Sequence, residues 1–244
     1  MVEESITTAL IIEDDMDWDV RIKLQLQQIA HGTQALQSFF PQTGNQSFVS
    51  PYGQNWDLLW LGHCGEIFPE TLEENNPSSL SPSELRTLSQ KYTIHPDVTM
   101  PPPHKTNGFQ NFTADPYTRW VHVSGGPICT FGYALSLQGA RKVLYDLSVD
   151  HLVGPFDNAL AGLCRWGRSS DRLGMRCLSV TPGVFMHHKA KGWVIGDSDI
   201  QNVDGGEKGT SREVGTTENV VWSARLNLRE LLIGGEMSSQ FGNE

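Results

Sequence analysis

A run of acidic residues directly follows a short apolar stretch near the start of the chain. Residues 9–12 are apolar and include two isoleucines, a pattern typical of a buried strand. The carboxylates of the run are those of Glu13, Asp14, Asp15, Asp17 and Asp19. Because neighbouring carboxylates repel one another unless a cation or solvent intervenes, the run indicates either an oxygen-ligand site for Mg²⁺ or Mn²⁺ at a sheet edge, or a solvated acidic turn. Residue types alone favour neither.

Two known acidic motifs fit the run poorly. The alternate aspartates have the spacing of an EF-hand calcium loop, but Val20 and Leu26 stand where that loop needs Gly and Glu. The apolar strand with its acidic end also resembles a signalling receiver domain. In such a domain the next strand would end in a phosphoacceptor Asp, and Gly62 stands there instead. A receiver-like signalling domain therefore stays a minor alternative.

Apolar spacing predicts an alternation of strands and helices around the run. Spacings of three and four residues over 22–40 predict a helix, with Asp17 or Asp19 as its N-cap. Asp157 is expected at the start of another helix, where an N-cap is the simplest role. Strands are expected over 8–12, 56–62, 120–123, 128–135 and 177–180, and further helices over 83–89, 136–147, 154–166 and 219–232. We expect one domain over residues 1–235, with a long irregular insertion at about 66–119 and a loose tail at 236–244.

Composition and charge narrow the classes of function. The net charge of −10 and the absence of a Lys/Arg run argue against binding to nucleic acid. No apolar segment is long enough for a transmembrane helix, and the acidic start does not fit a signal peptide. The four cysteines lack CxxC spacing, so buried free thiols are expected rather than a zinc site. Two sequons, at Asn45 and Asn111, would matter only in a secretory lumen.

Four pieces of the sequence form an ordered set of motifs. They are Ala-Leu-Ile-Ile-Glu-Asp-Asp (9–15), Tyr-Ala-Leu-Ser-Leu-Gln-Gly-Ala-Arg-Lys-Val-Leu (133–144), Pro-Phe-Asp-Asn-Ala-Leu (155–160), and Phe-Met-His-His (185–188) with Ser-Asp-Ile (198–200). Together they resemble glycosyltransferase family 25, which includes bacterial lipooligosaccharide and procollagen galactosyltransferases, and the fungal members most of all. The resemblance implies a GT-A-like (Rossmann-like) α/β fold with a mixed, mostly parallel sheet flanked by helices. It also implies an N-terminally truncated chain that lacks the first βα unit.

The resemblance further implies a hexosyltransferase. Such an enzyme moves a sugar, galactose in this family, from a UDP-sugar to a hydroxyl of a glycan or protein with inversion. Mn²⁺ or Mg²⁺ would stabilise the leaving diphosphate as a Lewis acid. Asp14 and Asp15 are the first ligands expected, and Glu13 and Asp17 the second choice. A carboxylate base would deprotonate the acceptor, and the candidates for base and pocket residues are Asp157, His187 and Asp199.

Two alternatives remain open at the level of sequence. The chain is either an active enzyme or a catalytically inactive GT-A remnant that only binds partners. A full-length form with a signal or anchor would act in the Golgi or ER lumen, and otherwise the protein would be cytoplasmic. A lumenal location would allow a Cys64–Cys129 disulfide, because both residues lie near the ends of strands expected to be neighbours.

Overall fold

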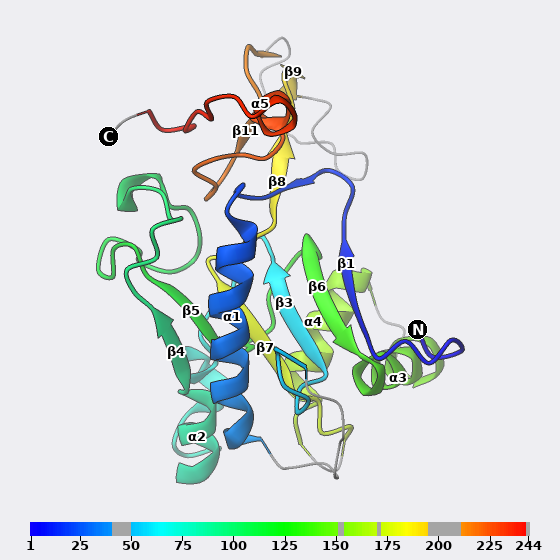
Figure 1. The fold of residues 1–244 in the computed structure, drawn as a ribbon. Helices are drawn as coiled ribbons and strands as arrows, with labels where there is room; N and C mark the ends of the chain where they lie inside the picture. The colour runs from blue at the N-terminus through cyan, green and yellow to red at the C-terminus, as the bar shows by residue number, and fades with distance from the viewer. Residues whose placement is uncertain (41–49, 151–153, 170–171, 195–210, 243–244) are drawn as a thin grey trace.

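A computed structural model describes residues 1–40, 50–150, 154–169, 172–194 and 211–242. A six-stranded sheet forms the centre of the described part (Figure 1). Its strands, in spatial order, are β1 (Thr8–Ile12), β6 (Gly132–Ser136), β3 (Leu58–Gly62), β7 (Cys177–Thr181), β5 (Arg119–Val123) and β4 (Lys91–Ile94).

The directions of the strands differ from the prediction. Only the β3–β7 pair is parallel among the described strands of this sheet, with Leu58 opposite Cys177. The other four pairs are antiparallel. The mixed α/β class is confirmed, but the expectation of a mostly parallel sheet is wrong. An apolar run indicates that a strand is buried, but it does not indicate whether the strand is parallel or antiparallel to its neighbours. The connections between strands decide that direction.

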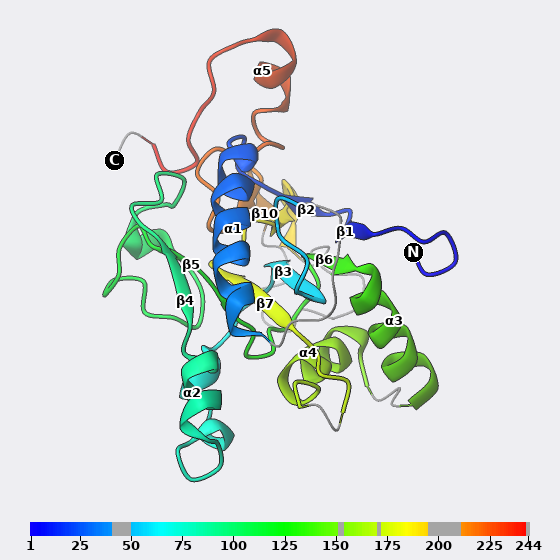
Figure 2. The same cartoon turned by 60° about the horizontal axis from the view of Figure 1, so that its bottom comes forward.

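Helices cover both faces of the sheet. On one face lies α1 (Ile22–Leu36), and below the other lie α3 (Leu137–Tyr145) and α4 (Phe156–Trp166), as Figure 2 shows. Alternation along β3 serves the two layers. Leu59 belongs to the core cluster on the α1 side, whereas Leu58 and Trp60 belong to the cluster on the α3 and α4 side. The sheet is therefore buried on both faces at its centre.

Several element boundaries also differ from the prediction. The helix α1 starts after Arg21 without a side-chain cap, so neither acidic candidate is its N-cap. The predicted strand over 128–135 begins only at residue 132, because Cys129 adopts a φ of +67°. Within the stretch predicted as an irregular insertion, α2 (Pro82–Leu88) confirms the helix expected over 83–89, whereas the edge strand β4 was not predicted. The last helix, α5 (Leu228–Ile233), is less than half as long as expected.

A second, smaller sheet joins the acidic run to the C-terminal part of the chain. Its order is β11 (Thr216–Thr217), β8 (Met186–Lys189) and β2 (Met16–Asp17), and it lies above the main sheet in Figure 1. The β9 (Gly192–Trp193) and β10 (Ser211–Arg212) strands pair nearby. Residues separated by some 200 positions in sequence therefore pack around the end of the acidic run.

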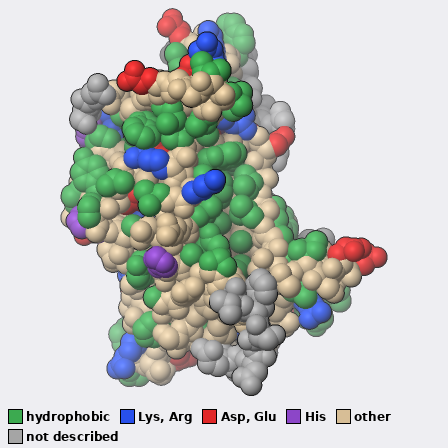
Figure 3. All heavy atoms as spheres, in the orientation of Figure 1, with side chains coloured by type: hydrophobic (Ala, Val, Ile, Leu, Met, Phe, Trp, Pro, Cys, Tyr) green, Lys and Arg blue, Asp and Glu red, His purple; other side chains and the backbone are tan. Residues whose placement is uncertain are grey.

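The edge strand β1 leaves apolar side chains in solvent. Leu10 and Ile12 are 47% and 36% exposed, whereas Ile11 packs toward the α3 side. Hydrophobic side chains gather on the face beside α1, as Figure 3 shows. The α1 helix therefore leaves the β1 end of this face uncovered.

Candidate functional site

The structure divides the acidic run into an exposed half and a buried half. Glu13, Asp14 and Asp15 follow β1 and are exposed. Asp17 and Asp19 are only 0% and 1% exposed. Because a buried carboxylate needs compensating donors, the two halves have different chemical environments and different roles.

Four donors from the protein surround the Asp17 carboxylate. Its Oδ1 accepts from the Trp18 amide (2.8 Å) and the Arg225 amide (3.1 Å). Its Oδ2 accepts from the hydroxyls of Thr217 (2.7 Å) and Ser223. These bonds fill the acceptor positions of both oxygens, so Asp17 holds the C-terminal segment in place and has no position left for a cation.

Asp19 also has a structural role. Its Oδ1 accepts from the backbone and the Nε of Arg21, at 2.9 and 2.7 Å, and its Oδ2 accepts from the Trp222 amide at 3.0 Å. The Arg21 guanidinium in turn lies 4.3 Å from the centre of the Trp222 ring. The carboxylate therefore joins the entry of α1 to the segment before α5.

The exposed half keeps its carboxylates accessible. Asp15 Oδ2 lies 3.2 Å from His187 Nε2, and the Asp15 side chain is 52% exposed. Glu13 accepts a hydrogen bond from the Thr130 hydroxyl. Within the described part of the chain, the Asp14 side chain makes no hydrogen bond, although its carbonyl oxygen accepts from Arg225. These three residues are the part of the run that a solvent-borne ligand can reach.

Residues 129–131, here the 129–131 loop, connect the predicted site residues. The Cys129 amide donates to Asp157 Oδ2 at 3.3 Å. The Phe131 carbonyl accepts from the Glu13 amide at 3.3 Å, and its ring centre lies 6.1 Å from that of His187. Residues from three distant stretches, namely Glu13, Asp157 and His187, therefore lie around one loop, at the carboxyl end of β1.

Asp157 lies in the first turn of α4, whose N-cap is Pro155. The simple role of helix cap is therefore wrong for this carboxylate, although the helix dipole still favours negative charge there. Its Oδ1 makes no hydrogen bond within the residues that the structure describes, while Oδ2 is held by the loop. Asp199, the remaining predicted pocket residue, lies outside the described residues.

The exposed carboxylates fit one type of metal site and not another. No group of three or more His, Cys, Asp or Glu side chains among the described residues is arranged to hold a metal ion. A closed protein cage is therefore not formed there. Mg²⁺ commonly binds through one or two carboxylates, with waters and substrate phosphates completing its shell. Asp14 and Asp15, with Glu13 beside them, have the oxygen donors for this second type.

Both cysteine pairs form disulfides. Cys64 pairs with Cys129, and Cys164 pairs with Cys177, with Cα atoms 5.5 Å apart in each pair. The expectation of free thiols is wrong. The Cys64–Cys129 pairing, which the sequence left open for a lumenal location, is formed. This bridge fixes the 129–131 loop to the end of β3, and so it fixes the loop around which the site residues gather.

Sequence reasoning missed a buried polar cluster beyond the end of β3. Glu66 Oε1 accepts from the Gly125 amide (2.5 Å) and the Ser124 hydroxyl (3.0 Å), while Oε2 lies 3.9 and 3.8 Å from Nε2 of His63 and His122. Burial raises the pKa of Glu66 to about 7 and lowers the pKa values of the two histidines to about 4 and about 3. The two imidazoles are therefore neutral at pH 7. The only signal in the sequence was a His and a Glu after an apolar strand.

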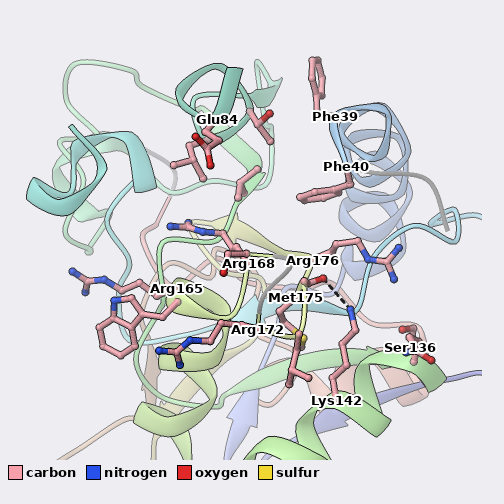
Figure 4. A pocket seen from close by; sticks show the side chains of 18 of the residues that line it. Phe39, Phe40, Glu84, Ser136, Lys142, Arg165, Arg168, Arg172, Met175 and Arg176 are labelled. Carbon is pink, nitrogen blue, oxygen red and sulfur yellow. Dashed lines mark hydrogen bonds between the residues drawn. The ribbon is translucent and has the colours of Figure 1, made fainter. Parts of the chain in front are cut away.

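A cavity of about 1280 Å³ lies at the opposite end of the sheet, beyond Ser136 (Figure 4). Six cationic side chains line it: Arg141, Lys142, Arg165, Arg168, Arg172 and Arg176. Lys142 and Arg176 both pair with buried Asp57, at 2.7 Å each. Arg165 forms a third ion pair, with Glu74, nearer the surface. None of the predicted site residues that the structure describes lines this cavity.

The described structure defines a mixed α/β protein with a mainly antiparallel central sheet. None of its described helices is long and apolar enough to cross a membrane. Comparison of the chain with protein-family models, curated proteins and solved structures found no match. The function must therefore be argued from the geometry of the site and from the motifs.

Proposed function

We propose that this protein is a glycosyltransferase. It moves a hexosyl group, galactose in the first instance, from a UDP-sugar to a hydroxyl of a glycan or protein, with inversion and with help from Mn²⁺ or Mg²⁺. One observation carries the proposal: side chains from three separate motifs, each resembling glycosyltransferase family 25, lie together at the 129–131 loop. Glu13 and Asp15 come from the first motif, Asp157 from the third and His187 from the fourth.

Exposed carboxylates at the loop suit the donor side of this reaction. Asp14 and Asp15 would hold the cation, with Glu13 next to them. The cation supplies Lewis-acid stabilisation of the diphosphate as its charge develops. Contact with His187 at 3.2 Å orients the Asp15 carboxylate. Asp17 takes no part, because its oxygens are occupied by protein donors.

Asp157 suits the acceptor side. A single inverting displacement needs a base close to the acceptor hydroxyl. The hydrogen bond from Cys129 fixes one oxygen of Asp157, and the other oxygen is left to accept a proton. The disulfide with Cys64 holds Cys129 itself in place. The base is thereby positioned by a cross-linked loop, which favours a constant geometry at the reacting atoms.

The test is release of UDP by the purified protein from UDP-galactose, UDP-glucose and UDP-N-acetylglucosamine with Mn²⁺, with and without EDTA. We expect EDTA to abolish turnover. Asp157→Asn should lower kcat by about 100-fold or more, the usual contribution of a general base. The Asp14→Asn/Asp15→Asn double variant should lose metal-dependent turnover without losing stability. Asp115→Asn, an exposed carboxylate away from the loop, is the matched control.

Turnover by the double variant equal to that of the wild type would refute the cation assignment. The main alternative is a catalytically inactive protein that only binds partners. In that case UDP and Mn²⁺ would raise the melting temperature while no donor is turned over. A receiver-like function is disfavoured because β3 ends at Gly62, where a phosphoacceptor carboxylate would be needed. A small phosphodonor should therefore leave the protein unlabelled.

A further inference from the structure

The cysteine chemistry of this chain indicates an oxidising compartment. All four cysteines of the sequence are paired. One bridge joins α4 to β7 inside the core, since Cys164 and Cys177 are 0% and 2% exposed. The other bridge spans 65 residues of sequence. Structural disulfides form and persist in secreted and lumenal proteins and are rare in the cytosol, where thiols are kept reduced.

A sequon lies on the surface of the same structure. Asn111 and Thr113 are exposed in the segment between β4 and β5, at the left of Figure 1. The residue between them, Phe112, is only 3% exposed and stacks on Trp120 with ring centres 6.3 Å apart. The buried phenylalanine anchors the turn, so its two neighbours face solvent.

The local hydrogen bonds leave the amide nitrogen of the sequon free. Asn111 Oδ1 accepts from the backbone amide of Thr113 at 3.2 Å and from its hydroxyl at 2.5 Å. Within the described residues, the Asn111 Nδ2 group donates no hydrogen bond. A glycan on this nitrogen would extend into solvent and would displace no packed side chain. The folded chain can therefore accommodate a glycan at this position.

We propose that this protein matures in the secretory lumen and carries an N-linked glycan on Asn111. Nδ2 of Asn111 forms a bond to the anomeric carbon of a lipid-linked oligosaccharide diphosphate. The bond between that carbon and the diphosphate oxygen breaks, the lipid diphosphate leaves, and the amide nitrogen loses one proton. Two independent features carry the proposal, namely the complete pairing of the cysteines and the exposed, anchored sequon. It does not depend on the proposed transferase activity.

The experiment uses the protein purified from its native cells. Peptide mass spectrometry after glycosidase treatment in ¹⁸O-water should find the heavy label at position 111. Peptides prepared without reduction, after alkylation of the intact protein, should contain both disulfides and no alkylated cysteine. The label must be assigned to a peptide because the chain has a second sequon, at Asn45, which lies outside the described residues.

Variants produced in the same cells separate the sequon from other causes. Thr113→Ala and Asn111→Gln should each remove the glycan at position 111, whereas Thr113→Ser should keep it, since serine retains the hydroxyl that the sequon needs. Disulfides without a glycan at position 111 would overturn the site. Alkylated cysteines in the native protein together with an unmodified Asn111 would overturn both the site and the compartment. A label that persists in Asn111→Gln would show another origin of the signal.

Discussion

The structural role of Asp17 leads to a sharp prediction, because sequence alone made this residue a candidate metal ligand. Replacing Asp17 by Ala removes an acceptor from four buried or half-buried donors. Each unsatisfied buried donor costs about 1–3 kcal/mol, partly relieved by water that enters the vacated space. We therefore expect the free energy of unfolding to fall by about 4 kcal/mol, within the usual range for breaking a buried charged network.

Asp17→Asn should cost less. Its remaining carbonyl oxygen can still accept from the two amides, of Trp18 and Arg225. Its amide nitrogen faces two hydroxyls, which can turn to act as acceptors. A loss of about 1–2 kcal/mol follows from the lost charge-assisted bonds. The two variants together distinguish loss of the acceptor from loss of the charge.

Urea unfolding followed by tryptophan fluorescence measures these differences in the free energy of unfolding. Trp18 and Trp222 report on the region, since their backbone amides donate to Asp17 and Asp19. The matched control is Asp15→Ala, which removes an exposed carboxylate and should change stability by less than about 0.5 kcal/mol. An Asp17→Ala midpoint equal to that of the wild type would refute the structural role. Equal losses for Asp15→Ala and Asp17→Ala would refute the division of the acidic run.

Three further predictions follow from buried groups. The wild type should lose stability as the pH rises from 4.5 through about 7, because Glu66 holds its proton more tightly in the folded state than in the unfolded chain. In Glu66→Gln this pH dependence should be absent, and urea midpoints across this range test it. Replacing Cys64 and Cys129 by Ser should cost about 4 kcal/mol, by loop-closure entropy, and should lower turnover as the loop is released; unchanged melting and unchanged kcat would contradict this. Although burial raises it, hydrogen bonds from Arg176 and Lys142 hold the pKa of Asp57 below 3.8. Asp57→Asn should therefore lower the free energy of unfolding by about 3–5 kcal/mol at pH 7, and its difference in stability from the wild type should shrink as the pH falls below 3.8. A difference in melting temperature that stays constant down to pH 2 would contradict a stabilising role of the Asp57 charge.

Short-range patterns in the sequence predicted several elements of the fold, including the strand that leads into the acidic run. The strand β1, the helix α1 and the Ser136 cap of α3 lie where apolar spacing and capping preference indicated. Such features depend on residues within a few positions of one another, so they can be derived from sequence. Strand direction depends on how the connections run in space. The β4–β5 pair, of which only β4 lies inside the predicted insertion, is therefore antiparallel for reasons that periodicity does not contain.

The sequence allowed a Cys64–Cys129 bridge because both residues lie near the ends of strands expected to be neighbours, and in the structure these strands are β3 and β6. The second bridge could not be predicted in this way. Cys164 lies within α4 and Cys177 opens β7, and nothing in their sequence spacing shows that this face of the helix packs on that strand. Disulfide pairing is a tertiary fact, and a count of four cysteines allows three pairings.

The acidic run shows most clearly why residue type alone cannot assign a site. Its carboxylates look equivalent in sequence, yet their environments are decided by residues that are some 200 positions away, such as Thr217 and Ser223. Those donors bury Asp17 and thereby remove it from any cation site. The three carboxylates before it are not buried by their partners, which are Thr130 for Glu13 and His187 for Asp15, and they stay in solvent beside the 129–131 loop. Within the run, only the carboxylates of residues 13–15 are open to a ligand from solvent. The Asp14→Asn/Asp15→Asn variant therefore tests the proposed reaction, whereas an Asp17 variant reports on folding.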